Sequence, residues 1–342
     1  MPNFDGVPHR KELVDTKEQV RDIRPYVEEL IALAHNDIEY TYRAEEVDPL
    51  ERRDYHNLTH TKGVEDKTTI ILNTIKNNSS VEITERDVML GRLIASHHDI
   101  DQSQKEPNII SEKMGEKEFQ KEIRVRYTVK IEQNSAGILV GRMEQINERE
   151  KKKIFTESDS TIATEAIEAT IPGFGKITAG YDLEGKPIEF GTILQPNLKE
   201  DASIITYAVA LADLGAMIDG GEEFLKDGNR VFREDNIDIA RALKDPAELQ
   251  KEGRKEFICS RILGWYKMQV SFVKGREILF KKHLIDLKER KGVSPEAILA
   301  IEKLFNFKDA IDAAETRLED PKNKKKSFEE LVLAMGYKLP NV

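Results

Sequence analysis

The sequence predicts an all-α protein: a helical bundle with a small β-hairpin insertion and an additional C-terminal helical region. Three observations predict it. Apolar residues recur at spacings of three and four through most of the chain, which is the period of a helix with one buried face. Hydrophobic residues make up 39% and charged residues 34% of the 342 residues, which suits helices with a charged outer surface. Residues 173–196 differ from the rest, because five glycines punctuate this short segment.

The first half of the chain is divided by breaker and capping residues. Asp48-Pro49 ends the first helical pattern, and Thr84, with Asp87 three residues on, is expected to cap a later helix. The polar residues 100–118 are expected to form a loop that closes into a further helix. Helices are predicted over residues 24–42, 60–77, 84–96, 117–148 and 157–170.

The second half begins with the glycine-punctuated segment, where Asp182-Leu183-Glu184-Gly185 predicts the turn of a small β-hairpin. An apolar helix follows, and the clearest later element is a long helix with one face repeating at four and three residues. Helices are predicted over residues 201–218, 256–287, 295–305 and 307–318, with a last short helix after the charged stretch 319–326. These elements indicate a polar arm over 1–22, a main domain over 23–220 and a C-terminal helical region over 221–342 that packs on it.

Composition narrows the classes of function. The net charge of −10 argues against binding to a nucleic-acid backbone, which requires clustered Lys and Arg. The single cysteine, Cys259, offers no internal disulfide or Cys-x-x-Cys pair. The N-terminus has no apolar stretch typical of a signal peptide, and no run approaches the ~18 apolar residues of a membrane span. A cytoplasmic protein without a membrane partner is expected, and a homo-oligomer stays open.

Two short motifs contain histidines that are candidates for metal binding. His56 and His60 are four residues apart, so a helix beginning there would place both on one side. His98-Asp99, at the end of a predicted helix, offers a nitrogen and an oxygen from adjacent positions, and both are usual ligands for divalent metals. Each motif alone also fits a surface or capping role.

A third feature lies far along the chain. Asp213 places one acid inside an otherwise apolar helix, where a charge is costly unless it is paired or bound to metal. Asp213 alone also fits a helix-capping or ion-paired residue. The two histidine motifs followed by this acid form a more specific pattern than any one of them.

In this order, His60, His98-Asp99 and Asp213 resemble the HD superfamily of metal-dependent phosphohydrolases, over roughly residues 24–220. The Tyr55-His56-Asn57-x-x-His60 segment resembles a bacterial branch of that superfamily and also the first motif of class I cyclic nucleotide phosphodiesterases. Two further segments resemble the bacterial branch: Glu132-x-x-Ser135-Ala136 and Ala169-Thr170.

The resemblance implies one divalent metal ion (Mn, Fe, Co, Ni, Zn or Mg) held by His60, His98, Asp99 and Asp213. Between Asp99 and the C-terminus the only histidine is His283, and this shortage favours a one-metal site over the binuclear members of the superfamily. The residues after Asp99 also do not support guanosine tetraphosphate hydrolysis.

The roles of the remaining motif residues follow from the same resemblance. His56 is expected to protonate the leaving oxygen, or instead to hold Asp99 or Asp213. Glu132 is a candidate to orient or deprotonate the attacking water, with a solvated helix glutamate as the alternative. The candidates for binding the substrate are Arg53, Asn57, Arg92, Gln269 and Arg276. For Arg53 and Arg92 the alternative is a surface arginine, and for Gln269 and Arg276 on the long helix it is a packing role.

The expected function is hydrolysis of a small anionic phosphoester, a nucleotide or cyclic nucleotide. A different class stays open: a regulatory module of HD fold that holds a metal or nucleotide without turnover and engages a protein partner. An oxygenase is a third reading, and the missing histidines argue against it.

Overall fold

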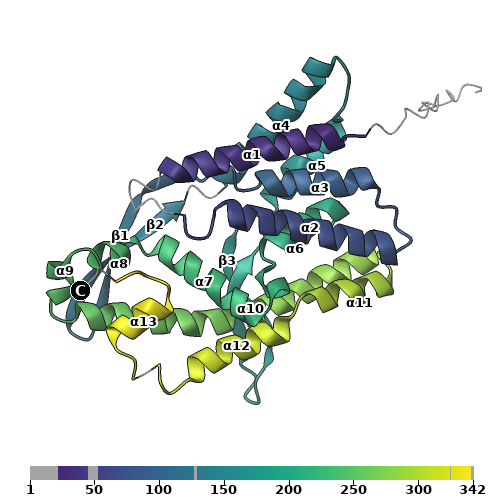
Figure 1. Cartoon of the computed structure of the whole chain (residues 1–342). Coiled ribbons are helices and arrows are strands. Elements are labelled where there is room, and N and C mark those ends of the chain that lie inside the picture. The colour runs from purple at the N-terminus through teal and green to yellow at the C-terminus, as the bar shows by residue number, and fades with distance from the viewer. Residues whose placement is uncertain (1–21, 45–52, 127–128, 324, 340–342) are drawn as a thin grey trace, which may run out of the picture.

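The chain folds mainly into helices, with 65% helix and 11% strand. The computed structural model describes residues 22–44, 53–126, 129–323 and 325–339 (Figure 1). The predicted mainly-α class is confirmed at this level. The polar arm predicted over residues 1–22 lies, except for its last residue, outside the described residues. None of the described helices is both long and apolar enough to cross a membrane.

The helical elements are α1 (Arg24–Ala44), α2 (Leu58–Asn78), α3 (Glu85–His97), α4 (Lys130–Glu150), α5 (Glu157–Glu168), α6 (Ile204–Asp213), the short 3-10 helix η1 (Ala216–Asp219), α7 (Gly221–Asp235), α8 (Ile237–Ala242), α9 (Pro246–Gln250), α10 (Arg254–Lys291), α11 (Pro295–Leu304), α12 (Phe307–Glu319) and α13 (Phe328–Ala334). The strands are β1 (Gln104–Met114), β2 (Lys117–Arg126), β3 (Gly173–Tyr181) and β4 (Pro187–Leu194). The segment 221–250, for which the sequence predicted no element, holds α7, α8 and α9.

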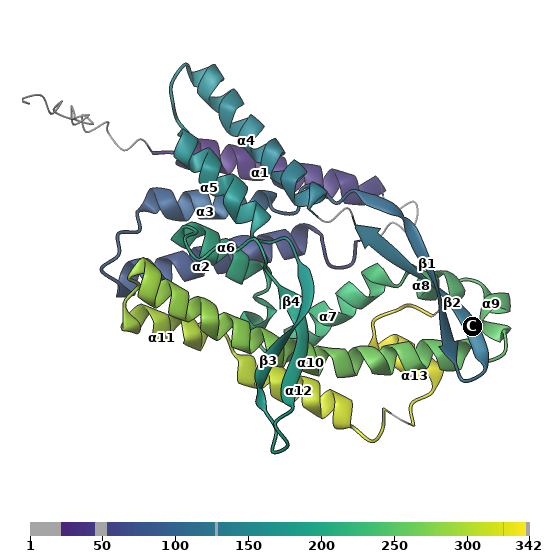
Figure 2. The same cartoon turned by 180° about the vertical axis from the view of Figure 1, so that it is seen from behind.

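The helices are arranged in tiers. In both views α1, α4 and α5 lie on one side of α2 and α6, and the long helix α10 runs along the other side with α11 and α12 (Figures 1 and 2). This arrangement brings the start of α2, the end of α3 and the end of α6 into the middle of the molecule.

Two apolar cores hold the tiers together. The larger core joins α1–α6 to α10–α12, and α10 contributes Val273 and Phe280 to it. The smaller core lies around α8 and α13, and α10 contributes Ile258 and Ile262 to it. The 38-residue helix α10 is therefore shared by both cores.

Local capping sets where the helices that carry the site begin. Asn57 caps α2: its side chain accepts hydrogen bonds from the backbone N–H groups of Thr59 and His60. Thr84 caps α3 in a reciprocal capping box with Asp87, which confirms the cap predicted from the sequence. Because both caps are local, they fix the first turn of each helix without tertiary help.

The segment 104–126 differs from its prediction. The expected loop over 100–118 and the helix starting at 117 are wrong here, because β1 and β2 pair as an antiparallel hairpin and α4 begins only at Lys130. Phe119 and Ile123 fit the period of two of a strand, and Gly115 adopts a positive φ of 65° in the tight turn. The Phe119 ring stacks on Phe257 at 4.7 Å, so tertiary packing of this hairpin on α10 favours the strand.

The second hairpin was predicted. β3 and β4 pair antiparallel over the glycine-punctuated segment, and Gly185, at φ 77°, lies in the predicted turn. β4 packs across α10: Gly191 donates its backbone N–H to Ser271 Oγ at 2.8 Å, and a Cβ on Gly275 would meet Thr192 Cβ at 2.8 Å. The missing side chain of Gly275 thus allows the hairpin to approach the helix.

Candidate metal centre

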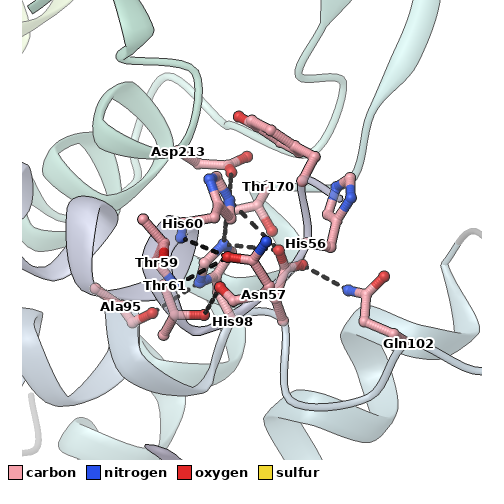
Figure 3. A network of polar contacts seen from close by, with 12 residues as sticks. His56, Asn57, Thr59, His60, Thr61, Ala95, His98, Gln102, Thr170 and Asp213 are labelled. Carbon is pink, nitrogen blue, oxygen red and sulfur yellow. Dashed lines mark hydrogen bonds and ion pairs between the residues drawn. The ribbon is translucent and has the colours of Figure 1, made fainter. Parts of the chain in front are cut away.

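The structure brings the four predicted ligands together from three helices. His60 lies in the first turn of α2, His98 and Asp99 directly follow α3, and Asp213 is the last residue of α6. Figure 3 shows His60, His98 and Asp213 facing one another. His60 Nε2 lies 3.3 Å from His98 Nε2 and 3.4 Å from Asp99 Oδ2.

Asp213 closes the group. Its Oδ1 lies 3.3 Å from His60 Nε2 and 3.5 Å from His98 Nε2, and Asp99 Oδ2 lies 3.2 Å from His98 Nε2. Neighbouring ligand atoms around a divalent ion with ~2.1 Å bonds are about 3.0–3.4 Å apart, so these spacings match. His60, His98 and Asp99 form a compact group that could hold a metal ion.

Hydrogen bonds to neighbouring groups orient His98 and Asp99 so that the atoms able to bind a metal face the centre. His98 Nδ1 lies 2.7 Å from the carbonyl of Ala95, which makes Nδ1 the protonated nitrogen and leaves the Nε2 lone pair for a metal. Gln102 donates to Asp99 Oδ1 at 2.9 Å. Asp99 Oδ2 is buried, and no described group makes a hydrogen bond of good geometry with it. A buried carboxylate oxygen left in this state fits a bound cation.

The electrostatics of the cluster are those of closely paired opposite charges. Burial alone would lower the pKa of His98, but the adjacent carboxylates of Asp99 and Asp213 outweigh it and raise this pKa well above its usual range. The pKa of His60 is raised against burial in the same way by hydrogen bonds to the same carboxylates. Burial alone would raise the pKa of Asp99, but the imidazoles hold it well below its usual range, and the pKa of Asp213 is also lowered. Protons therefore occupy the imidazoles when no metal does.

Metal binding should release protons at pH 6–7. A metal needs both imidazoles neutral, and the raised pKa values of His60 and His98 keep them protonated in the metal-free protein. Titration calorimetry with Mn²⁺ or Zn²⁺ in buffers of different ionisation enthalpy measures the release. We expect up to about two protons per ion near pH 6 and an affinity that rises with pH. Binding without proton release at pH 6 would contradict ligation by these histidines.

His56 lies beside the cluster but is held by a different partner. Its Nδ1 is 2.9 Å from Glu234 Oε1, and Glu234 Oε2 accepts the backbone N–H groups of Tyr55 and His56 at 2.8 and 3.0 Å. The Glu234 side chain is 0% exposed, on α7. The histidine is thus oriented through Nδ1 by a carboxylate 178 residues away in the sequence, which the sequence analysis did not find. Glu234 lies in the segment 221–250, for which no element was predicted, so no local signal marked it.

Glu132 occupies the first turn of α4 and is 6% exposed. Burial, together with the negative charges of Asp99 and Asp213, raises its pKa to about 7. No described group makes a hydrogen bond with its buried Oε2. A carboxyl group in this state near the centre changes protonation at neutral pH, as a general base requires. Ser135, one turn later, accepts the backbone N–H of Asp101 at 3.1 Å and so fixes the loop that follows Asp99.

His97, next to His98, faces away from the centre. Its ring is buried, with Nδ1 3.0 Å from the carbonyl of Leu93 and Nε2 3.1 Å from the guanidinium of Arg142. Burial, together with Arg142, lowers the pKa of His97 to about 3, so the ring is neutral. Adjacent histidines thus have opposite roles, because successive residues at a helix end point in different directions.

The predicted substrate-binding residues fall into two groups. Arg53 and Asn57 line a cavity of about 390 Å³ beside His60, where Asn57 also serves as the cap of α2. The other three lie outside the described lining of this cavity. Arg92 pairs with Glu28 at 2.6 Å, Arg276 is buried and donates to Gln195 Oε1 at 2.9 Å, and Gln269 is buried against Gly228.

The cavity also contains cations that the sequence analysis did not select. Lys67 lies on α2 two turns after His60, and Arg230 and Arg233 lie on α7. The spacing of seven residues from His60 to Lys67 and of three from Arg230 to Arg233 can be read from the sequence. Nothing in the sequence indicated that α7 faces the start of α2.

No family model matches the chain, and no significant match was found among curated proteins or solved structures. The site therefore has to be interpreted from its own geometry.

Proposed function

We propose that this protein is a metal-dependent phosphoester hydrolase of the HD type, with one divalent ion held by His60, His98, Asp99 and Asp213. The observation that supports the proposal most is the convergence of two imidazole nitrogens and two carboxylate oxygens: each carboxylate oxygen lies 3.2–3.5 Å from the Nε2 atoms of both histidines, and no described group makes a hydrogen bond of good geometry with the buried Asp99 Oδ2. A divalent ion held there would polarise a phosphoryl oxygen and lower the pKa of water.

The residues around the centre supply the rest of the reaction. His56, held through Nδ1 by Glu234, presents Nε2 as the proton donor to the leaving oxygen. Glu132 accepts a proton from the attacking water. Its pKa of about 7 allows the carboxyl group both to take up and to release a proton near neutral pH. Arg53, in the neighbouring cavity, provides a donor for a phosphoryl oxygen.

The decisive experiment is a turnover panel combined with metal analysis. The purified protein is loaded with Mn²⁺, Co²⁺, Ni²⁺, Zn²⁺ or Mg²⁺ and assayed on p-nitrophenyl phosphate, bis(p-nitrophenyl) phosphate, nucleotides, cyclic nucleotides and sugar phosphates. We expect about one metal equivalent per chain and turnover of at least one phosphoester class. Metal binding without turnover of any member supports the alternative, a regulatory module. Absence of stoichiometric metal binding contradicts both.

Glu132→Gln should lower kcat by about 10²-fold or more, the lower end of the range for general acid–base catalysis. In the unchanged protein the rate should rise as pH passes the pKa of Glu132, at or below about 7 because a bound cation stabilises the carboxylate. The pH–rate profile measures this, and the variant should lose that limb. Glu144→Gln, an exposed glutamate on the same helix, is the matched control. An unchanged acid limb in Glu132→Gln would exclude this residue as the base.

A further inference from the structure

The cavity beside His60 is lined mostly by polar and charged residues. It lies between α2 and α7, with a volume of about 390 Å³, within the usual range for small-molecule sites. The lining residues are Arg53, Asp54, Tyr55, Asn57, Thr59, His60, Gly63, Lys67, Asp219, Glu223, Asp227, Arg230 and Arg233. Since His60 belongs to the metal cluster as well, a phosphoester bound at that cluster would extend its remaining part into this cavity.

The charges of the lining are balanced by ion pairs. Lys67 Nζ lies 2.6 Å from Asp219, and Arg230 lies 2.6 Å from Asp227 and 3.1 Å from Glu223. Arg233, also on α7, is 3.0 Å from Asp54. A second phosphate in this cavity would have to displace carboxylates from these pairs. The cavity therefore does not favour a diphosphate or polyphosphate, which would need an excess of cations.

A nucleobase also lacks a suitable surface here. Pockets for such ligands are mostly apolar and aromatic, whereas the described lining contains no Val, Leu, Ile, Met, Phe or Trp. Tyr55 is its only aromatic residue besides His60, and its ring packs at 4.4 Å against His60 and 4.7 Å against His56. The tyrosine is thus engaged with the catalytic histidines rather than with an open stacking face.

Hydroxyl groups match this lining. A hydroxyl both donates and accepts, so it can donate to a carboxylate and accept from the guanidinium or ammonium paired with it. Each ion pair of the cavity presents such a neighbouring acceptor and donor. Asp227 is one of these acceptors: its side chain is 18% exposed and pairs with Arg230 at 2.6 Å, and burial raises its pKa.

We propose that the cavity binds the hydroxyl-rich part of a sugar or polyol monophosphate, with the phosphate at the metal centre. This inference rests on the proposed function and replaces, as the favoured substrate class, the nucleotide suggested by family resemblance.

Binding and turnover are measured on the full chain loaded with Mn²⁺. Titration calorimetry compares glucose 6-phosphate, sorbitol 6-phosphate and inositol 1-phosphate with AMP and pyrophosphate, and kcat/KM is measured for each. We expect at least one sugar or polyol phosphate to exceed AMP and pyrophosphate about 10-fold or more in both measurements. Tighter binding of AMP or pyrophosphate than of every sugar or polyol phosphate would overturn the inference. If no compound, including p-nitrophenyl phosphate, is hydrolysed, the proposed function fails, while the binding comparison still decides the ligand class.

A charge-removing variant gives a result that a general loss of structure would not. Asp227→Asn should raise KM for the preferred sugar phosphate about 10- to 100-fold, the effect of one hydrogen bond to a charged group. The same change leaves an excess of positive charge on Arg230, so the affinity for pyrophosphate should increase. Glu222→Gln, an exposed glutamate on α7 that pairs with Lys226, is the matched control. Equal weakening of both ligands by Asp227→Asn would overturn the assignment of Asp227 as a hydroxyl acceptor.

Discussion

Replacing His98 by alanine should remove the proposed metal ion and lower kcat/KM by at least about 10²–10³-fold, the scale of one lost electrostatic contact to the transition state. We expect the same of Asp213→Ala, because Asp213 Oδ1 lies 3.3 and 3.5 Å from the Nε2 atoms of His60 and His98. Metal content of the purified variants, measured by elemental analysis, and turnover on the best phosphoester test this result. Full metal retention in both variants would exclude the site.

The control is the neighbouring histidine. His97→Gln changes a buried ring that contacts Leu93 and Arg142 and not the centre, so metal should be retained. This variant should cost about 1–3 kcal/mol of stability, because the guanidinium of Arg142 loses a buried partner. Thermal unfolding of both variants separates loss of folding from loss of metal. Equal metal loss in His97→Gln and His98→Ala would show that the assay reports destabilisation only.

Replacing His56 by alanine leaves the metal in place and lowers kcat by about 10²–10⁴-fold, the range for one general acid. The structure gives the reason: the imidazole lies beside the ligands and is held through Nδ1 at 2.9 Å from Glu234. The deficit should be smallest for p-nitrophenyl esters, whose leaving group needs little protonation. A deficit of the same size for poor and good leaving groups would contradict the role of a proton donor.

Glu234 is a positioning residue, and its substitution tests that role separately. Glu234→Gln keeps an acceptor for the backbone N–H groups of Tyr55 and His56 and removes the carboxylate oxygen that orients His56 through Nδ1. The value of kcat should therefore fall more for esters with poor leaving groups than for p-nitrophenyl esters, with KM little changed. A purely structural residue would lower stability without this dependence on the leaving group.

The four proposed ligands could be named from the sequence because each belongs to a local pattern. A His-Asp dipeptide at a helix end and an acid in the apolar helix α6 are visible without a fold, and the cap at Thr84 is equally local. The structure adds that each carboxylate oxygen lies within 3.5 Å of the Nε2 atoms of both histidines. The choice of His98 rather than His97 rested on resemblance, since direction at a helix end cannot be read from spacing alone.

The remaining parts of the fold and of the candidate site depend on contacts between distant segments of the chain. Charged residues that alternate with apolar ones over 104–126 suit a helix or a strand, and the stacking of Phe119 on Phe257 helps decide for a strand. Glu234 and Arg230 lie on a charged helix whose inner face is defined only once α7 packs near the start of α2. No local signal distinguishes them from solvated residues.

Helix α10 limits how this chain can be shortened or recombined. Its two ends belong to different cores, with Phe280 in one and Ile258 in the other. A gene fragment that stopped near residue 220 would still encode all four proposed ligands, yet it would expose the apolar groove left by α10 and lack Glu234. We therefore expect the bundle and its C-terminal third to be inherited, expressed and exchanged only together, although the proposed ligands all come from the first 213 residues.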